Sequence, residues 1–137
     1  MHPKRDSMTM HEVIISLGSN ENQEANLAKA REQLTQLLME VHFTSTIWAE
    51  PYYIEHGTLN IEHGQSKKYL NQLCKGTTAF GEGLLCEVLK ETEKRIGRIK
   101  NENGIVVIDL DLLQFDGQKH HLRDWNRDYV KILLNEL

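Results

Sequence analysis

Apolar residues gather along this chain in short runs of two kinds, and the first kind predicts strands. Its runs are rich in β-branched and aromatic residues and end at glycine, proline or polar turn residues, a pattern typical of β-strands. They cover residues 13–17, 43–49, 69–77 and 104–115. The last run is the longest and is almost wholly apolar, so we expect it to be the buried central strand of a sheet.

The second kind of run repeats apolar residues every three or four positions, which predicts amphipathic helices. One helix begins near residues 22–25 and carries its apolar stripe as far as Val41. Another covers residues 85–96 and ends at Gly97, since glycine is favoured just after a helix C-terminus. A last helix is expected over residues 125–137.

The order of these elements, β-α-β-β-α-β followed by a helix, predicts an α+β fold of the ferredoxin-like class. We expect a mixed sheet with two helices on one face, while the last helix covers the other face or leaves it as a cleft. Residues 13–137 are expected to form this single domain after a flexible extension over residues 1–12. Residues 54–68 and 118–123 are expected to be loops, and Asp124 is expected to be the N-cap of the last helix.

Composition narrows the classes of function. A chain of 137 residues with 39% hydrophobic and 26% charged residues is typical of one ordinary globular domain. Its net charge of −4 argues against a nucleic-acid partner, and no apolar run approaches the length of a membrane span. Cys74 and Cys86 lack metal or redox spacing, so we expect reduced, buried thiols in a cytoplasmic protein.

Two aspartates interrupt the apolar run over residues 104–115. Asp109 and Asp111 are two apart, so on a strand their side chains share one face. Adjacent buried carboxylates repel each other, which favours a cation between them. Mg²⁺ suits such a pair when a substrate phosphate completes its coordination shell. An exposed edge strand with both aspartates on its polar face is the alternative, and the pattern alone leaves both open.

Nearby polar and aromatic residues fit the same chemistry. Arg98 and Lys100 precede the aspartates, and basic side chains beside metal-bridging acids recur in phosphoryl transfer. Tyr69 and Asn71 are again two apart, so they could stack on a heterocycle and hydrogen-bond its edge. Gly18 follows a strand and precedes a helix, where backbone can approach a ligand. A solvated loop, ordinary strand residues and a plain turn are the respective alternatives.

Together these residues resemble the hydroxymethyldihydropterin pyrophosphokinase family of folate biosynthesis. The matching motifs are Ile15-Ser16-Leu17-Gly18-Ser19-Asn20, Pro51, Tyr69-Leu70-Asn71, Glu93 with Gly97-Arg98, and Ile108-Asp109-Leu110-Asp111-Leu112-Leu113. The resemblance implies an Mg²⁺-dependent enzyme that transfers pyrophosphate from ATP to 6-hydroxymethyl-7,8-dihydropterin and releases AMP. Its expected partners are these small molecules, with no nucleic acid and no membrane, and we expect a monomer or weak dimer.

The resemblance also assigns roles to individual residues. Asp109 and Asp111 would hold two Mg²⁺ ions and, with Arg98, would be the catalytic residues. The residues expected at ATP are Glu93, Arg98, Lys100, His121 and Arg127. Those expected at the pterin are Glu50, Pro51, Tyr53, Tyr69, Asn71 and Tyr129, with Tyr69 and Tyr129 on either side of the ring.

The chain departs from the family pattern in the connector before the aspartates. Family members carry a longer loop there, with a tryptophan and an arginine that close over ATP. Here Asn103 and Val106 fall roughly at those two positions. A binding-only homologue with a reduced ATP lid is therefore the alternative function. A ferredoxin-like interaction domain with aspartates as surface charge is a third.

Overall fold

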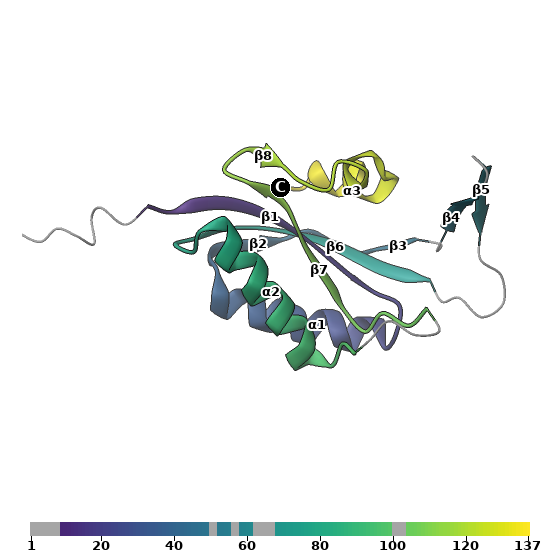
Figure 1. Ribbon diagram of the computed structural model, residues 1–137, viewed down its shortest axis with the longest axis horizontal. Helices are drawn as coiled ribbons and strands as arrows, with labels where there is room; N and C mark the ends of the chain where they lie inside the picture. Colours follow the sequence, from purple (N-terminus) through teal and green to yellow (C-terminus); the bar gives the residue numbers. More distant parts are fainter. Residues whose placement is uncertain (1–8, 50–51, 56–57, 62–67, 100–103) are drawn as a thin grey trace, which may run out of the picture.

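A computed structural model describes residues 9–49, 52–55, 58–61, 68–99 and 104–137 (Figure 1). Its helices and strands follow in chain order as β1 (His11–Ser19), α1 (Gln23–Leu37), β2 (Met39–Phe43), β3 (Ile47–Ala49), β4 (Tyr52–Glu55), β5 (Thr58–Ile61), β6 (Tyr69–Thr78), α2 (Glu82–Ile96), β7 (Asp109–Phe115), β8 (Gln118–Lys119), the 3₁₀-helix η2 (Asp124–Asn126) and α3 (Asp128–Leu134). Within these ranges no helix is long and apolar enough to cross a membrane. The site predictions at Glu50, Pro51 and Lys100 lie outside the described residues.

The main sheet has the strand order β2-β6-β1-β7-β8, and β3 also pairs with β6. This order, with α1 and α2 as the two crossover helices, confirms the ferredoxin-like α+β class. The expectation of a mixed sheet was wrong, because all of these strand pairs are antiparallel. The segment expected as a loop over residues 54–68 contains part of a small hairpin in which β4 pairs with β5.

The central strand is β1 and not the run over residues 104–115. β1 lies between β6 and β7, whereas β7 starts only at Asp109 and has the two-residue β8 beyond it. The residues before Asp109 lie outside the strand and are held by other contacts. Val106 donates its backbone N–H to the Asn20 Oδ1 atom at 2.6 Å, and the side chain of Ile108 is fully buried. That half of the run is therefore a loop anchored to the end of β1.

Helices α1 and α2 cover one face of the sheet, and α3 lies on the opposite face (Figure 1). The larger core lies under α1 and α2 and includes Ile15, Leu17, Leu34 and Leu89. Gly97 ends α2 at φ +133°, a conformation that favours glycine, so this predicted C-cap is confirmed.

A smaller core lies on the other face. Val130 and Leu133 of α3 are buried against Ile14, Leu73 and Leu113 of three adjacent strands. The last helix therefore covers this face, which was one of the two expected outcomes.

The strand expected over residues 43–49 is two strands, β2 and β3, separated at Thr44. The Thr44 backbone N–H donates to the Leu73 carbonyl at 2.9 Å, and the Thr44 hydroxyl accepts the Leu73 N–H at 3.0 Å. A side chain thus replaces one backbone partner in the ladder, which interrupts the regular pairing. Cys74 and Cys86 are both free, but only Cys74 is buried, so the expectation for Cys86 was wrong.

The expected helix over residues 125–137 begins later and is shorter. Asp124 opens the 3₁₀-turn η2 and is not the cap of α3, whose N-cap is Arg127 without a side-chain hydrogen bond. Asp124 instead forms an ion pair with Arg127, with Oδ1 and Nε 3.1 Å apart. The expected loop before it also contains the short strand β8.

Candidate active site

Three neighbouring strands bring Asp109, Gly18 and Asn71 into one row across the sheet. Gly18 of β1 pairs with Asp109 of β7 on one side and with Asn71 of β6 on the other. Directly opposed residues of antiparallel strands point to the same face. A Cβ atom on Gly18 would lie 3.0 Å from Asn71 Oδ1 and 3.8 Å from Tyr69 Cδ2. The glycine therefore lets these two side chains lie against the backbone between them and Asp109.

The next row on this face contains Ser16, Asp111 and Leu73. Ser16 pairs with Asp111 and with Leu73, and Leu73 packs against α3. Both aspartates therefore point to the side of the sheet that α3 covers. Tyr129 of α3 confirms this placement, because its hydroxyl lies 3.3 Å from Ser16 Oγ.

The two carboxylates repel each other strongly. Burial raises the pKa of Asp111 to about 8, and the charge of Asp109, a hydrogen bond to it and the more distant Asp124 and Glu93 act in the same direction. Asp109 is held differently, since its Oδ1 atom accepts a hydrogen bond from Arg98 Nη1 at 2.9 Å. Arg98 therefore pairs with Asp109, while burial and the neighbouring carboxylate disfavour the charged form of Asp111.

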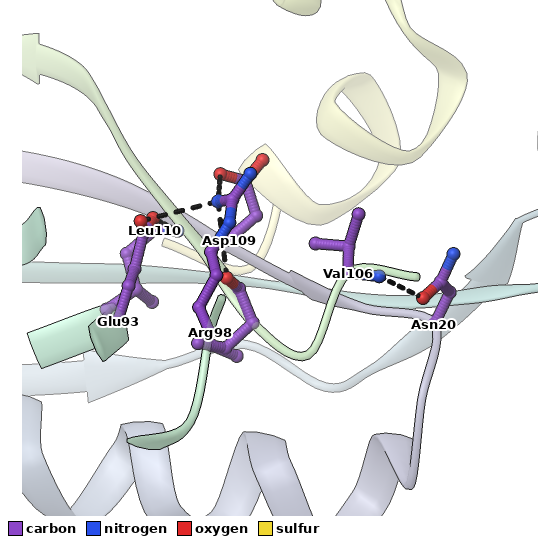
Figure 2. Close-up of polar contacts among 7 residues, drawn as sticks. Asn20, Glu93, Arg98, Val106, Asp109 and Leu110 are labelled. Atoms are coloured by element: carbon purple, nitrogen blue, oxygen red, sulfur yellow. Dashed lines mark hydrogen bonds and ion pairs between the residues drawn. The ribbon is translucent and has the colours of Figure 1, made fainter. Parts of the chain in front are cut away.

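Arg98 follows α2 and is itself positioned by Glu93, near the end of that helix (Figure 2). Glu93 is 5% exposed, and its Oε1 atom lies 3.3 Å from Arg98 Nη1. Its Oε2 atom accepts the Leu110 backbone N–H at 2.7 Å. Burial raises the pKa of Glu93 although this hydrogen bond and Arg98 oppose the shift. Glu93 thereby joins α2 to the outer side of β7 between the two aspartates.

Two phenols flank the acidic pair. Burial raises the pKa of Tyr69, with Asp109 as the next cause and with Arg98 and Arg127 acting in the opposite direction. Tyr129 also has a raised pKa, first because of burial, while its hydrogen bond to Ser16 opposes the shift and Asp111 contributes to it. Both hydroxyls thus remain protonated, and both lie within the field of the aspartates.

Of the other predicted residues, His121 does not join this group, whereas Arg127 lies close to it. His121 is exposed on the loop before η2 at φ +53°, and its ring forms no hydrogen bond or ion pair with the residues that the structure describes. Arg127 lies near Tyr69 and is paired with Asp124. Tyr53 lies on β4, opposite Asn60.

Sequence reasoning missed Ser16 and Asn20 as parts of the site. Ser16 is the one polar residue in the run Val13–Leu17, and its alternation with Gly18 on one face was an available signal. Asn20 holds the segment before β7 by donating to the Gly104 carbonyl at 2.7 Å. Its Oδ1 atom also accepts the Val106 backbone N–H (Figure 2). No local pattern reveals that second role, because the partners are more than eighty residues away.

The donor set fits Mg²⁺ that is bound together with a phosphate. Asp109 and Asp111 offer hard oxygen ligands side by side. Across the described part of the chain, no group of three or more histidine, cysteine or acidic residues could hold a metal ion without further ligands. Mg²⁺ commonly takes one or two carboxylates and completes its shell with waters and substrate phosphates.

The fold and this face together define a ferredoxin-like α+β protein with an acidic pair, an arginine and two phenols grouped beside a glycine. The sequence pattern of the 7,8-dihydro-6-hydroxymethylpterin-pyrophosphokinase (HPPK) family matches residues 14–137. The chain therefore belongs to that family, as its motifs indicated.

A plant protein and two solved bacterial structures are similar to this chain. It is 29% identical over 146 aligned positions to a folate synthesis bifunctional protein of Arabidopsis thaliana, covering 96% of this chain. The chain spans only 28% of the length of that protein. Structures of B. subtilis GlnK and of its ATP complex align with 76% and 79% of this chain, and with 86% and 87% of their own, at 16% and 17% identity. Both TM-scores are 0.39, which is too low to indicate function.

Proposed function

We propose that this chain transfers the terminal pyrophosphate of ATP to the hydroxymethyl oxygen of 6-hydroxymethyl-7,8-dihydropterin and releases AMP. Membership of the pyrophosphokinase family supports the reaction class. The observation that carries the proposal is the grouping of Asp109, Asp111, Tyr69, Asn71 and Tyr129 on one face of the sheet. Acids for a metal–phosphate complex and aromatic rings for a flat heterocycle are thereby adjacent.

The pterin is assigned to the phenol side of this group. Tyr69 and Tyr129 are the stacking residues, because both are uncharged and come from opposite elements of the same face. Asn71 offers both a donor and an acceptor to the edge of the ring. Glu50, Pro51 and Tyr53 are assigned to the rim of the same pocket on the resemblance alone.

The triphosphate is assigned to the acidic side. Asp109 and Asp111 would hold two Mg²⁺ ions, which when bound neutralise phosphate charge and align the reacting groups. Arg98 then directs its guanidinium to a phosphate, and Glu93 keeps it there. Lys100, His121 and Arg127 are the further ATP residues.

The reaction itself is an in-line displacement. The hydroxymethyl oxygen forms a bond to the β-phosphorus, and the bond from this phosphorus to the oxygen bridging it to the α-phosphorus breaks. That oxygen leaves with AMP, and the hydroxyl proton passes to solvent. We place the reaction in the cytoplasm.

The test is an assay for AMP formation from ATP, Mg²⁺ and the reduced pterin. Asp109→Asn and Asp111→Asn are each expected to lower the rate about 100-fold or more, because each removes a metal ligand. Asp116→Asn, in the exposed turn after β7, is the matched control and leaves the rate unchanged. Binding of both substrates without AMP under any divalent cation identifies the binding-only homologue. Absence of pterin binding overturns the proposal.

A further inference from the structure

Helix α3 carries Tyr129, so whatever holds α3 determines where this phenol lies. The helix has only seven residues and no side-chain cap, and helices of this length are not stable by themselves. Val130 and Leu133 fix its inner side against the sheet. Apolar contacts are non-directional, however, and do not by themselves set the distance of Tyr129 from a partner on another strand.

Directional contacts hold α3 at both ends. Before the helix, Trp125 Nε1 donates to the carbonyls of Leu113 and His120, at 3.2 and 2.9 Å. After the helix, the Glu136 carboxylate accepts two hydrogen bonds of 2.7 Å, one from the Ser45 backbone N–H and one from its hydroxyl. These two bonds lower the pKa of Glu136 and so keep it ionised.

The position of Ser45, the partner of Glu136, shows which elements this contact connects. Ser45 lies in the short link between β2 and β3, and β3 pairs with the start of β6. In that pairing Ile47 opposes Asn71 and Ala49 opposes Tyr69. Glu136 therefore connects the helix of one phenol to the strand that flanks the other phenol and the amide.

We propose that Glu136 is a positioning residue for the pterin, because its link to Ser45 fixes the separation of Tyr129 from Tyr69. A ring held between two aromatic faces needs a defined spacing, and a misplacement of about 1 Å weakens such contacts steeply. The inference rests on the proposed function and extends it to a residue that touches neither substrate nor metal.

The experiment measures two dissociation constants by calorimetry. The first is the dissociation constant of the protein for the Mg²⁺ complex of α,β-methylene ATP. The methylene group of this analogue replaces the oxygen at the bond that would break. The second is that of the reduced pterin at saturating Mg²⁺ and this analogue. Glu136→Ala is expected to raise the pterin constant about 5- to 10-fold and to leave the nucleotide constant within about twofold. Glu87→Ala is the matched control, since Glu87 is exposed on α2 and has no hydrogen bond or ion pair to the described residues.

Two further variants keep the inference testable if Glu136→Ala does not fold. Ser45→Ala removes one of the two hydrogen bonds, and Glu136→Gln retains one acceptor oxygen, so each is expected to weaken pterin binding by about 2- to 3-fold. An unchanged pterin constant, or equal weakening of pterin and nucleotide, overturns the positioning role. If the wild-type chain binds no pterin, the proposed function fails first, and that outcome is distinct from a failure confined to the variants.

Discussion

At the scale of the residue, Gly18 shows how closely the site is packed. Its backbone is an ordinary strand, but a Cβ atom there would meet Asn71 Oδ1 at 3.0 Å. Gly18→Ala is therefore expected to fold and to displace the Asn71 amide, lowering pterin affinity about 10-fold through the lost hydrogen bonds. A pterin titration monitored by fluorescence measures this change.

The control for this prediction is Gly83→Ala in the first turn of α2, where a Cβ atom would meet nothing within 4 Å. That change is expected to leave affinity unaltered and to stabilise the helix by about 0.5–1 kcal/mol. Combining Gly18→Ala with Asn71→Ala should weaken binding no more than Asn71→Ala alone. An additive loss would show that Gly18 acts by another route.

Asp111 predicts a dependence of stability on pH. Burial, with Asp109 beside it, raises the pKa of Asp111 from 3.8 to about 8 in the folded chain. The unfolded chain therefore loses this proton first, and Asp111 makes the fold progressively less stable as pH rises between these two values. Asp111→Asn cannot ionise, so its stability relative to wild type should increase from pH 4 to pH 8 and then level off. Urea unfolding in EDTA measures this difference.

Asp116 is a control, because its contribution to stability is expected to change with pH in the opposite direction. Hydrogen bonds from His11 and from the Glu12 backbone N–H lower the pKa of Asp116, so it stabilises the fold above its unfolded pKa and loses this effect as pH falls through the folded pKa. Asp116→Asn should destabilise the protein at neutral pH and have little effect in strong acid. Parallel pH profiles for Asp111→Asn and Asp116→Asn would contradict at least one of the two assignments.

At the scale of the element, Glu93 joins α2 to the side of β7 that faces away from β1. It accepts the Leu110 N–H, which points away from β1 and would otherwise be a buried donor without a partner. Glu93→Ala is expected to cost about 1–3 kcal/mol, the usual penalty of one unsatisfied buried group. Glu93→Gln should cost less, because its amide oxygen can still accept this hydrogen bond. Both losses of stability are measured from the midpoints of denaturant unfolding, provided that the m-value is unchanged.

The control on the same helix is Glu91→Ala. Glu91 is 64% exposed and pairs only with Lys94 among the residues described, so its loss is expected to change stability by less than about 0.5 kcal/mol. A comparable loss at both positions would show that Glu93 does not stabilise the fold through its hydrogen bond to β7.

The order of elements and the acidic pair could be predicted from the sequence, because strand alternation and helical period are local signals. The predicted two-residue spacing of Asp109 and Asp111 does place them on one face. The centre of the sheet was predicted wrongly, because residues 104–108 form a loop in which Val106 and Ile108 are buried and the Val106 backbone is hydrogen-bonded to Asn20. Such burial depends on partners far along the chain and has no period of its own. The split at Thr44 escaped prediction for the same reason, because a hydroxyl replaces a backbone partner there.

At the scale of the whole molecule, the two faces of the sheet carry two separate hydrophobic cores that contribute differently to the candidate site. The core under α1 and α2 contains Leu89, while the smaller core under α3 contains Leu133, and these side chains are 2% and 1% exposed. Only the second core supports Tyr129 beside the acidic pair. Leu89→Ala and Leu133→Ala are each expected to destabilise the free protein by about 2–5 kcal/mol.

The two variants are expected to differ in how much added ligands raise their melting temperatures. Pterin with Mg²⁺ and α,β-methylene ATP raises the melting temperature through selective binding to the folded state, and the increment depends on affinity. Leu89→Ala is expected to keep the wild-type increment, because its cavity lies on the face opposite the site. Leu133→Ala is expected to lose much of it, since α3 can then shift Tyr129 away from the ring. Differential scanning fluorimetry with and without ligands measures both increments. Equal increments would mean that α3 stabilises the fold without positioning the pterin.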